Sequence, residues 1–305
     1  MILSRIGMKD INALSDFHYL TKNRASAVIK IDVMKLLIVG LAFLLTNIYP
    51  LKAKSQAVDT MVDAGGYKLH FNIIKGSGVP ILFESGGGHD GTVWNDIVKR
   101  LHGSTNATLI TYDRAGMGKS GIDTTHITIL GEVQGLQKAL KNLGYTKSIF
   151  LVAHSFGGAY ATLFGSKAEN RVKGAVLIDI TLSCFMTPEK AKEMTEPYKK
   201  ELLDFKEKTI GTYYLLLNYV KSTDLLRNTH FPSTIPATVI SSDSSPYTGR
   251  DSIVWKSCQK SFGELPYHHY IMAEETSHYV YLDNPELVTN EILKLYNLTS
   301  VKKKR

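Results

Sequence analysis

Short apolar runs alternate with segments of helical periodicity from about residue 66 onward, and this alternation constrains the fold most strongly. Strands are expected at 67–74, 79–84, 107–112, 148–153, 172–180, 237–242 and 269–272. Helices are expected at 93–101, 127–143, 156–168 and 285–296. Strands that are apolar throughout are typical of parallel sheets covered by helices on both faces. The sequence therefore predicts an α/β fold with a mostly parallel central β-sheet flanked by helices.

The alternation is interrupted between residues 183 and 235. There, charged helical stretches precede a stretch rich in Tyr and Leu at 213–219. We interpret residues 183–235 as a helical cap inserted into a core made of residues 60–182 and 236–300. The stretch 213–219 could line an apolar substrate pocket, or it could form the packing face of the cap. Residues 301–305 form a basic tail.

An apolar run near the N-terminus has the composition of an export signal. The ten residues 36–45 carry no charge and follow Lys35, and small residues suited to cleavage lie shortly after them. The run is short for a membrane span, which needs about 20 apolar residues. We interpret residues 34–55 as a signal peptide, with an uncleaved membrane anchor as the alternative, and residues 1–33 as an over-extended leader. The protein is then expected to be periplasmic or secreted, or anchored in the membrane if the segment is retained.

The net charge of +8 is concentrated at the two ends of the chain. Residues 1–57 carry a net charge of +5 and residues 302–305 carry +4, so residues 58–301 carry a net charge of −1. A nearly neutral body lacks the broad positive field that attracts polyanions. No nucleic-acid partner is expected, and a membrane contact is expected only through the N-terminal segment. The sequence leaves the oligomeric state open.

The chain has two cysteines, Cys184 and Cys258. They could form one disulfide in an exported protein, or they could be two buried free thiols. Their spacing is not that of metal ligands, and the sequence contains no Walker A, G-x-G-x-x-G or H-E-x-x-H motif in the required context. Neither a metal nor a cofactor is expected.

The segment 151–159 (LVAHSFGGA) carries the most specific chemical signal. Ser155 lies between an expected strand and an expected helix, with Ala153 two residues before it and Gly157 two residues after it. Only small residues fit at those two positions of a turn that lifts a serine oxygen above a sheet. The segment resembles the nucleophile elbow of the α/β-hydrolase family, although that family usually has glycine where this chain has Ala153. The resemblance extends over about residues 65–300 and implies that Ser155 is a nucleophile.

The segment 277–286 resembles the terminal signature of the same family and implies that His278 is the general base. A triad also needs an acid that orients the histidine and stabilises its protonated form. Asp179 ends the strand expected at 172–180, a position where some relatives carry this acid. Asp243 follows the strand expected at 237–242. We favour Asp179 and keep Asp243 as the alternative.

Two loops complete the resemblance. Residues 82–88 are similar to the family's oxyanion loop, which implies that the backbone N–H groups of Gly87 and Phe156 hold a developing oxyanion. The loop that contains Asp113 and Arg114 is similar to the family's D-x-x-G-x-G-x-S loop. We interpret Asp113 and Arg114 as scaffolding.

These features predict a serine hydrolase that cleaves a small carboxylic ester, thioester or amide through an acyl-enzyme intermediate. The expected partner is a small acyl substrate. A serine at the elbow disfavours epoxide hydrolase and dehalogenase chemistry, which use a carboxylate nucleophile in this fold. One alternative is an aminopeptidase of the proline-iminopeptidase type, with Glu189, Glu193 or Glu196 holding the substrate amine. A second alternative is a non-catalytic member of the fold that binds a ligand or a partner.

Overall fold

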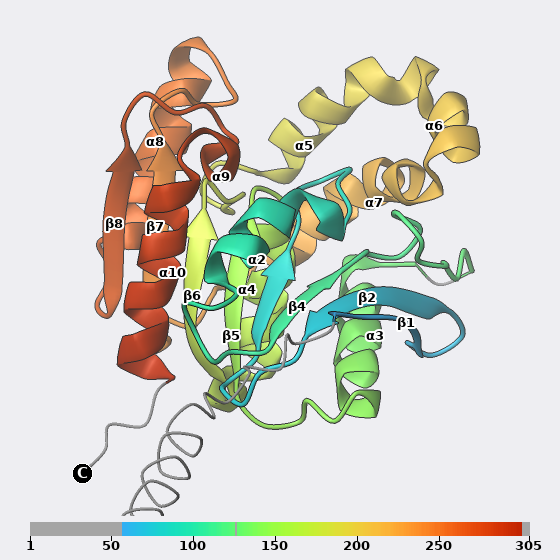
Figure 1. The fold of residues 1–305 in the computed structure, drawn as a ribbon. Helices are drawn as coiled ribbons and strands as arrows, with labels where there is room; N and C mark the ends of the chain where they lie inside the picture. The colour runs from blue at the N-terminus through green and yellow to red at the C-terminus, as the bar shows by residue number, and fades with distance from the viewer. Residues whose placement is uncertain (1–56, 126, 301–305) are drawn as a thin grey trace, which may run out of the picture. The chain divides into compact units, whose positions relative to one another are not determined.

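The computed structural model describes residues 57–125 and 127–300, and an eight-stranded sheet runs through them (Figure 1). The strand order is β1-β2-β4-β3-β5-β6-β7-β8. The pairs β1–β2 and β2–β4 are antiparallel, and the five other pairs are parallel. The predicted α/β fold with a mostly parallel sheet is confirmed. The interpretations of residues 1–33, 34–55 and 301–305 lie outside the described residues.

The strands coincide with the apolar runs of the sequence, with one addition. They are β1 Ala57–Asp63, β2 Lys68–Ile74, β3 Ile81–Glu84, β4 Leu109–Tyr112, β5 Ile149–His154, β6 Val172–Ile178, β7 Ala237–Ser242 and β8 His268–Ala273. All residues of β3, β4, β5 and β7 are buried, as expected for strands covered on both faces. The strand β1 was not expected from the sequence; it is an edge strand whose residues alternate between exposed and half-buried.

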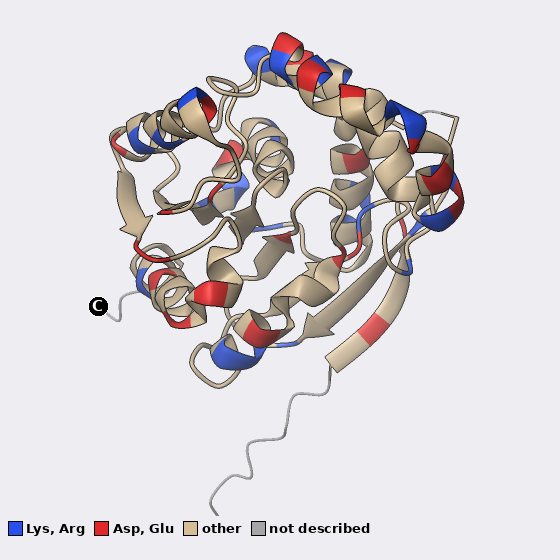
Figure 2. Ribbon diagram, turned by 90° about the horizontal axis from the view of Figure 1, so that it is seen from above, with Lys and Arg blue, Asp and Glu red and all other residues tan. Residues whose placement is uncertain are grey.

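Helices fill the interval between β6 and β7, and we call residues 183–235 the inserted segment. Its helices are α5 Pro188–Thr195, η3 Glu196–Lys200, α6 Leu202–Lys208 and α7 Ile210–Arg227. Figure 2 shows cationic and anionic residues mixed along these helices. Such mixing is typical of a solvated surface rather than of a binding patch for polyanions.

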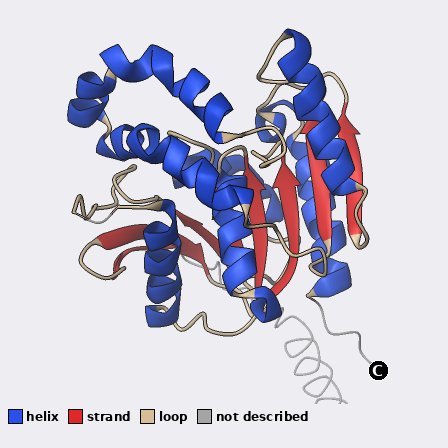
Figure 3. Cartoon of the chain, turned by 180° about the vertical axis from the view of Figure 1, so that it is seen from behind, coloured by secondary structure: helices blue, strands red, loops and turns tan. Residues whose placement is uncertain are grey.

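The remaining helices cover the two faces of the sheet (Figure 3). Residues of η1, α2, α9 and α10 pack on one face, and residues of α3, α4 and α8 pack on the other. Their bounds are η1 Gly91–Trp94, α2 Asn95–Leu101, α3 Ile129–Asn142, α4 Gly157–Lys167, η2 Glu169–Arg171, α8 Gly249–Gly263, α9 Val280–Asp283 and α10 Pro285–Thr299. None of the described helices is both long and apolar enough to span a bilayer.

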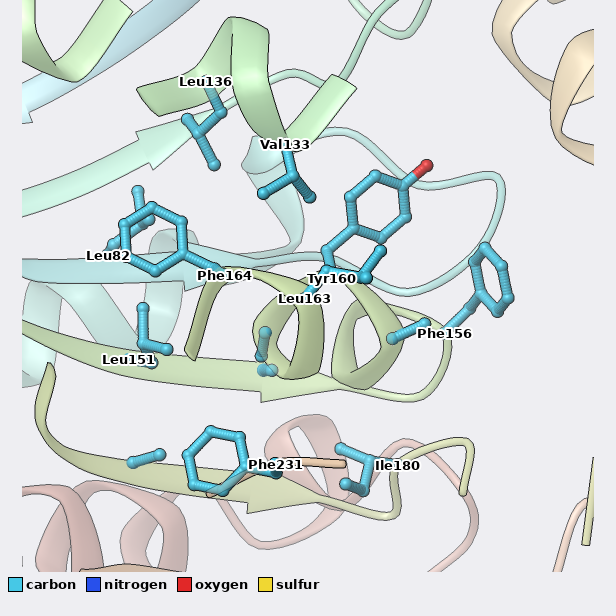
Figure 4. Packing of buried hydrophobic residues seen from close by; sticks show 14 of the residues in the cluster. Leu82, Val133, Leu136, Leu151, Phe156, Tyr160, Leu163, Phe164, Ile180 and Phe231 are labelled. Atoms are coloured by element: carbon cyan, nitrogen blue, oxygen red, sulfur yellow. The ribbon is translucent and has the colours of Figure 1, made fainter. Parts of the chain in front are cut away.

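The helix α4 is fixed in place by burial on nearly every side. All of its residues from Gly157 to Gly165 are buried, which explains why its sequence shows almost no amphipathic pattern. Figure 4 shows Tyr160, Leu163 and Phe164 of this helix packed among residues of α3 and the sheet. The N-terminus of α4, which begins two residues after Ser155, is therefore fixed in place by packing.

The two cysteines are joined in a disulfide. Cys184 lies at the start of the inserted segment and Cys258 lies in α8, and their Cα atoms are 6.0 Å apart. This distance falls in the usual range for a disulfide. The sequence left open either one disulfide or two buried free thiols, and the structure has the disulfide.

Candidate active site

A tight turn between β5 and α4 presents Ser155. The backbone of Ser155 has φ 53°, a left-handed conformation that is uncommon outside glycine. A Cβ atom on Gly157 would lie 2.5 Å from the carbonyl oxygen of Ser85 and 2.6 Å from that of Glu84. Only glycine fits there because the turn lies against the end of β3. The local structure is the strand–turn–helix context that a nucleophile elbow requires.

Three side chains form a hydrogen-bonded chain at the carboxyl ends of the parallel strands. The Nε2 atom of His278 lies 2.9 Å from the Oγ atom of Ser155. The Nδ1 atom of His278 lies 2.6 Å from the Oδ2 atom of Asp179. A neutral imidazole that donates from Nδ1 to the carboxylate leaves Nε2 free to accept the serine proton. This arrangement can activate a serine oxygen.

The carboxylate of Asp179 is fully buried and accepts three hydrogen bonds besides that of His278. The indole Nε1–H of Trp255 donates to Oδ1 over 3.0 Å. Ser242 donates its backbone N–H to Oδ1 over 3.2 Å and its hydroxyl to Oδ2 over 2.9 Å. Such donors compensate for the loss of water around a buried anion. Sequence reasoning missed both Trp255 and Ser242, because neither lies in a motif and Trp255 lies in a helix that was not expected.

Asp243, the alternative acid, does not reach the histidine. Its side chain is 52% exposed, and its Oδ1 atom lies 3.6 Å from the Nζ atom of Lys256. Its backbone N–H donates to the carbonyl of Ala273, which continues the β7–β8 pairing. The structure brings Asp179, not Asp243, to His278.

A second histidine supports the loop that carries the first. The Nε2 atom of His154 lies 2.9 Å from the backbone carbonyl oxygen of His278 and therefore donates to it. Burial lowers the pKa of His154 well below its ordinary value, and the nearby His278 adds to this effect. His154 is thus a neutral donor that helps to hold the loop of His278 in place.

The loop after β3 lies beside the elbow. A Cβ atom on Gly86 would lie 2.9 Å from Nδ1 of His154, so glycine permits the close approach of this loop. A Cβ atom on Gly87 would lie 3.6 Å from Cβ of Phe156, which places these two residues next to each other. Among the described residues, no acceptor takes a hydrogen bond from the N–H of Gly87 or Phe156. Both N–H groups are therefore available to a ligand.

Asp113 holds several loops together. Its carboxylate accepts the backbone N–H of Gly91 and that of Lys119, each over 2.9 Å, and lies 2.9 Å from Nδ1 of His70. The neighbouring guanidinium of Arg114 donates to the backbone carbonyls of Ser85 and Gly86. Neither side chain contacts Ser155 or His278 through a hydrogen bond among the described residues.

Apolar side chains of the inserted segment border the site. A Cβ atom on Gly87 would lie 3.8 Å from Cδ1 of Leu215, and the ring of Tyr219 stacks on that of Phe156 with centroids 4.8 Å apart. The stretch 213–219 is therefore divided: Leu215 and Tyr219 face the loops of the site, whereas Leu217 is exposed.

A separate cavity of about 570 Å³ lies among α4, α7 and α8. Phe231, Phe262 and the disulfide line it, and Ser155, Asp179 and His278 do not. The site is therefore located by its hydrogen-bond chemistry rather than by cavity size. Within the described ranges, no three His, Cys, Asp or Glu side chains are grouped so that they could hold a metal ion.

Comparisons with known proteins identify the family of this chain. The model of the alpha/beta hydrolase family matches residues 81–291. The uncharacterized protein YqjL of Bacillus subtilis (strain 168) is 27% identical over 238 residues, which cover 77% of this chain and 90% of that protein. A haloalkane dehalogenase of Agrobacterium fabrum is 26% identical over 121 residues, which cover 40% of this chain and 38% of that protein.

Solved structures show the same fold. An esterase from Thermogutta terrifontis superposes with a TM-score of 0.58 at 18% identity, over 78% of this chain and 97% of that one. The family match spans more than half of the chain and includes the elbow, the buried aspartate and the histidine loop. The chain belongs to the alpha/beta hydrolase family.

Proposed function

We propose that the protein is a serine hydrolase that cleaves a small carboxylic ester through an acyl-enzyme intermediate. The observation that carries this proposal is the hydrogen-bonded chain from Ser155 through His278 to Asp179, with its serine on a strained turn. A serine hydroxyl is a weak nucleophile at its ordinary pKa, and a base within hydrogen-bond distance activates it.

The proposed reaction has two halves. His278 takes the proton of Ser155 through Nε2 as the serine oxygen attacks the substrate carbonyl, and Asp179 stabilises the imidazolium that forms. The leaving alcohol departs with that proton. Water then loses a proton to Nε2 as it attacks the acyl-enzyme, and the released serine oxygen regains a proton from His278. In both halves the N–H groups of Gly87 and Phe156 hold the negative oxygen.

The surroundings of the serine favour an uncharged acyl group. Leu215, Phe156 and Tyr219 border the oxyanion loop, and burying apolar substrate surface against them is favourable. The resemblance of a segment to a haloalkane dehalogenase supports only a shared fold, because such enzymes use a carboxylate where this chain has Ser155.

The aminopeptidase alternative gains no support. Its three candidate amine-binding residues are exposed and lie beside cations of the same segment: Glu189 near Arg227 at 3.9 Å, Glu193 with Lys190 at 3.0 Å and Glu196 with Lys199 at 2.6 Å. Their charges are balanced at the surface and none of them contacts Ser155 or His278.

We also propose that the protein is exported, with residues 34–55 as the signal peptide. The disulfide between Cys184 and Cys258 supports this proposal, because such bonds persist in oxidising compartments. Mass spectrometry of the protein from its natural host should find an N-terminus close to residue 56. An N-terminus at residue 34 or upstream of it would contradict cleavage after residue 55.

A fluorophosphonate probe tests the proposed activity. The probe should form an adduct that peptide mass spectrometry locates on Ser155, and the Ser155→Ala variant should form none. A series of p-nitrophenyl esters from acetate to decanoate then measures kcat/KM against acyl length. A folded wild-type protein that neither reacts with the probe nor hydrolyses any of these esters would instead favour a ligand-binding member of the fold.

A further inference from the structure

We infer that Arg114 is a positioning residue for the oxyanion hole, because its guanidinium sets the direction in which the N–H of Gly87 points. The inference deepens the proposed function and rests on it. It assigns to a buried cation of the scaffold an influence on the rate of the chemical step that acts through the oxyanion loop.

The guanidinium of Arg114 donates hydrogen bonds to two consecutive peptide groups. Its Nη1 atom donates to the carbonyl oxygen of Ser85, and its Nη2 atom donates to that of Gly86. The residue is only 3% exposed, so water does not compete for these bonds. The planar fork of arginine suits this paired recognition, which a lysine ammonium cannot reproduce.

The geometry of the peptide bond carries the effect from one side of the loop to the other. The carbonyl of Gly86 and the N–H of Gly87 belong to the same peptide group, which is trans and planar. In such a group the C=O and the N–H point in opposite directions. Fixing the Gly86 carbonyl toward Arg114 therefore directs the Gly87 N–H away from the guanidinium, and Gly87 itself lies next to Phe156.

The guanidinium is itself held from its other side. Its Cζ atom lies 4.7 Å from the ring centroid of Tyr160, at a distance typical of a cation–π contact. The Tyr160 hydroxyl donates to Oε1 of Glu132 over 3.1 Å, which ties the ring to α3. Figure 4 shows Tyr160 on α4 close to Val133 of α3. The chain of contacts thus runs from the packed helices through Arg114 to the oxyanion loop.

The positive charge also strengthens the donor that it orients. A cation at the carbonyl end of a peptide group draws electron density away from the amide, so the N–H becomes a better hydrogen-bond donor. This donor is needed most when negative charge develops on the substrate oxygen, that is, in the transition state. The loss of Arg114 should therefore lower kcat more than it weakens substrate binding.

The test replaces Arg114 with lysine, which keeps the charge and removes the fork. With p-nitrophenyl butyrate, Arg114→Lys should lower kcat by about 10- to 100-fold, less than the roughly 10²- to 10³-fold loss that follows removal of an entire oxyanion donor. The KM should stay within about twofold. The inhibition constant of an alkyl trifluoromethyl ketone, which forms a tetrahedral oxyanion on the serine, should rise by the same factor as kcat falls.

Arg171 provides the matched control. It also donates to two backbone carbonyls, those of Lys147 and Tyr145, and its Cζ atom lies 5.8 Å from the ring centroid of Phe164. Arg171→Lys should leave kcat and the ketone affinity unchanged. In glycine-labelled protein, the amide NMR signal of Gly87 should move in Arg114→Lys and stay in place in Arg171→Lys.

The outcomes separate this inference from the proposed function. Wild-type protein without probe labelling or turnover refutes the hydrolase proposal, and the NMR comparison still tests the positioning. If the Gly87 signal does not move, or if Arg114→Lys raises KM while kcat and ketone affinity are retained, the positioning role is overturned.

Discussion

At the scale of single residues, the site depends on a buried charge that is held in one geometry. Asp179 has no contact with solvent and accepts four hydrogen bonds, from Trp255, His278 and two groups of Ser242. Removing one partner of such a network costs free energy, because the remaining polar groups stay buried without a hydrogen-bond partner. Asp243 lies one residue beyond Ser242, yet it is half-exposed and serves a different role.

The first prediction compares these two aspartates. Asp179→Asn should lower kcat by about 10⁴-fold, because an amide no longer favours the imidazole tautomer that leaves Nε2 free to accept a proton. Asp243→Asn should change kcat by less than about twofold, because a surface charge next to a lysine contributes little. Steady-state rates on a p-nitrophenyl ester check both. Equal losses in the two variants would contradict the assignment of Asp179.

The second prediction concerns Glu84, at the end of β3. Burial raises the pKa of this carboxyl to about 7, although Arg114 and the hydroxyl of Tyr112 favour its charged form. Between pH 4.5 and 7 the folded protein keeps a proton that the unfolded chain has released. The contribution of Glu84 to the free energy of unfolding is therefore fully present below pH 4.5, and it is lost as the pH rises through 7.

Urea unfolding at pH 5 and pH 8 measures this effect. Between these values the wild type should lose roughly 2–3 kcal/mol relative to Glu84→Gln, which keeps an acceptor for Tyr112 but does not ionise. The exposed Glu286→Gln variant serves as the control and should keep the wild-type slope. A Glu84→Gln protein with the same pH dependence as the wild type would show that Glu84 is ionised in the fold.

At the scale of elements, most strands and helices follow from local patterns, and α8 does not. The strand predicted at 237–242 has the bounds of β7, and the helix predicted at 285–296 lies within α10. The sequence of α8 contains Gly, Asp and Ser, which are weak helix formers, and few of its residues are buried. Contacts with β7 and β8 stabilise this helix, so no window of the sequence could indicate it.

The third prediction tests what α8 contributes to the site. Trp255→Phe keeps an aromatic ring in the core but removes the N–H that donates to Asp179, so kcat should fall by roughly 10- to 100-fold. Trp94→Phe is the matched control, because Trp94 is also fully buried but its Nε1–H has no partner among the described residues. Trp94→Phe should cost stability and leave kcat within about twofold. Steady-state assays measure the change in kcat, and urea unfolding measures the change in the free energy of unfolding.

At the scale of the whole molecule, the sheet order creates the site. The strands β5, β6, β7 and β8 are neighbours and run parallel, so their carboxyl ends meet at one edge. Ser155, Asp179 and Ser242 each lie at the end of one of these strands, and His278 lies in the loop after β8. Catalytic groups of open α/β sheets gather at this edge for the same reason.

The fourth prediction concerns the disulfide, which ties the inserted segment to α8 across 74 residues of sequence. Replacing both cysteines with serine should lower the free energy of unfolding by about 4 kcal/mol, because the unfolded chain regains the freedom of that loop. Each single variant, Cys184→Ser or Cys258→Ser, should lose a similar amount. Two free thiols in the denatured, unreduced wild type would contradict the bridge.

The sequence alone determined the features that depend on neighbouring residues. The parallel strands follow from their continuous apolar composition, and the elbow around Ser155 follows from the small residues that a tight turn requires. His278 was found through the resemblance of residues 277–286 to a family signature. The strands and the elbow are set by backbone sterics and by burial over a few residues, and both can be read from a short window.

Tertiary structure decided the features that depend on distant partners. His278 meets Asp179 across 99 residues and Ser155 across 123 residues. Three further features depend on which strand ends and helices become neighbours. They are the choice between Asp179 and Asp243, the donors Trp255 and Ser242, and the hydrogen bonds of Arg114 to the oxyanion loop. Burial then gives these few polar contacts their strength, because without water a charge must find its partners within the protein.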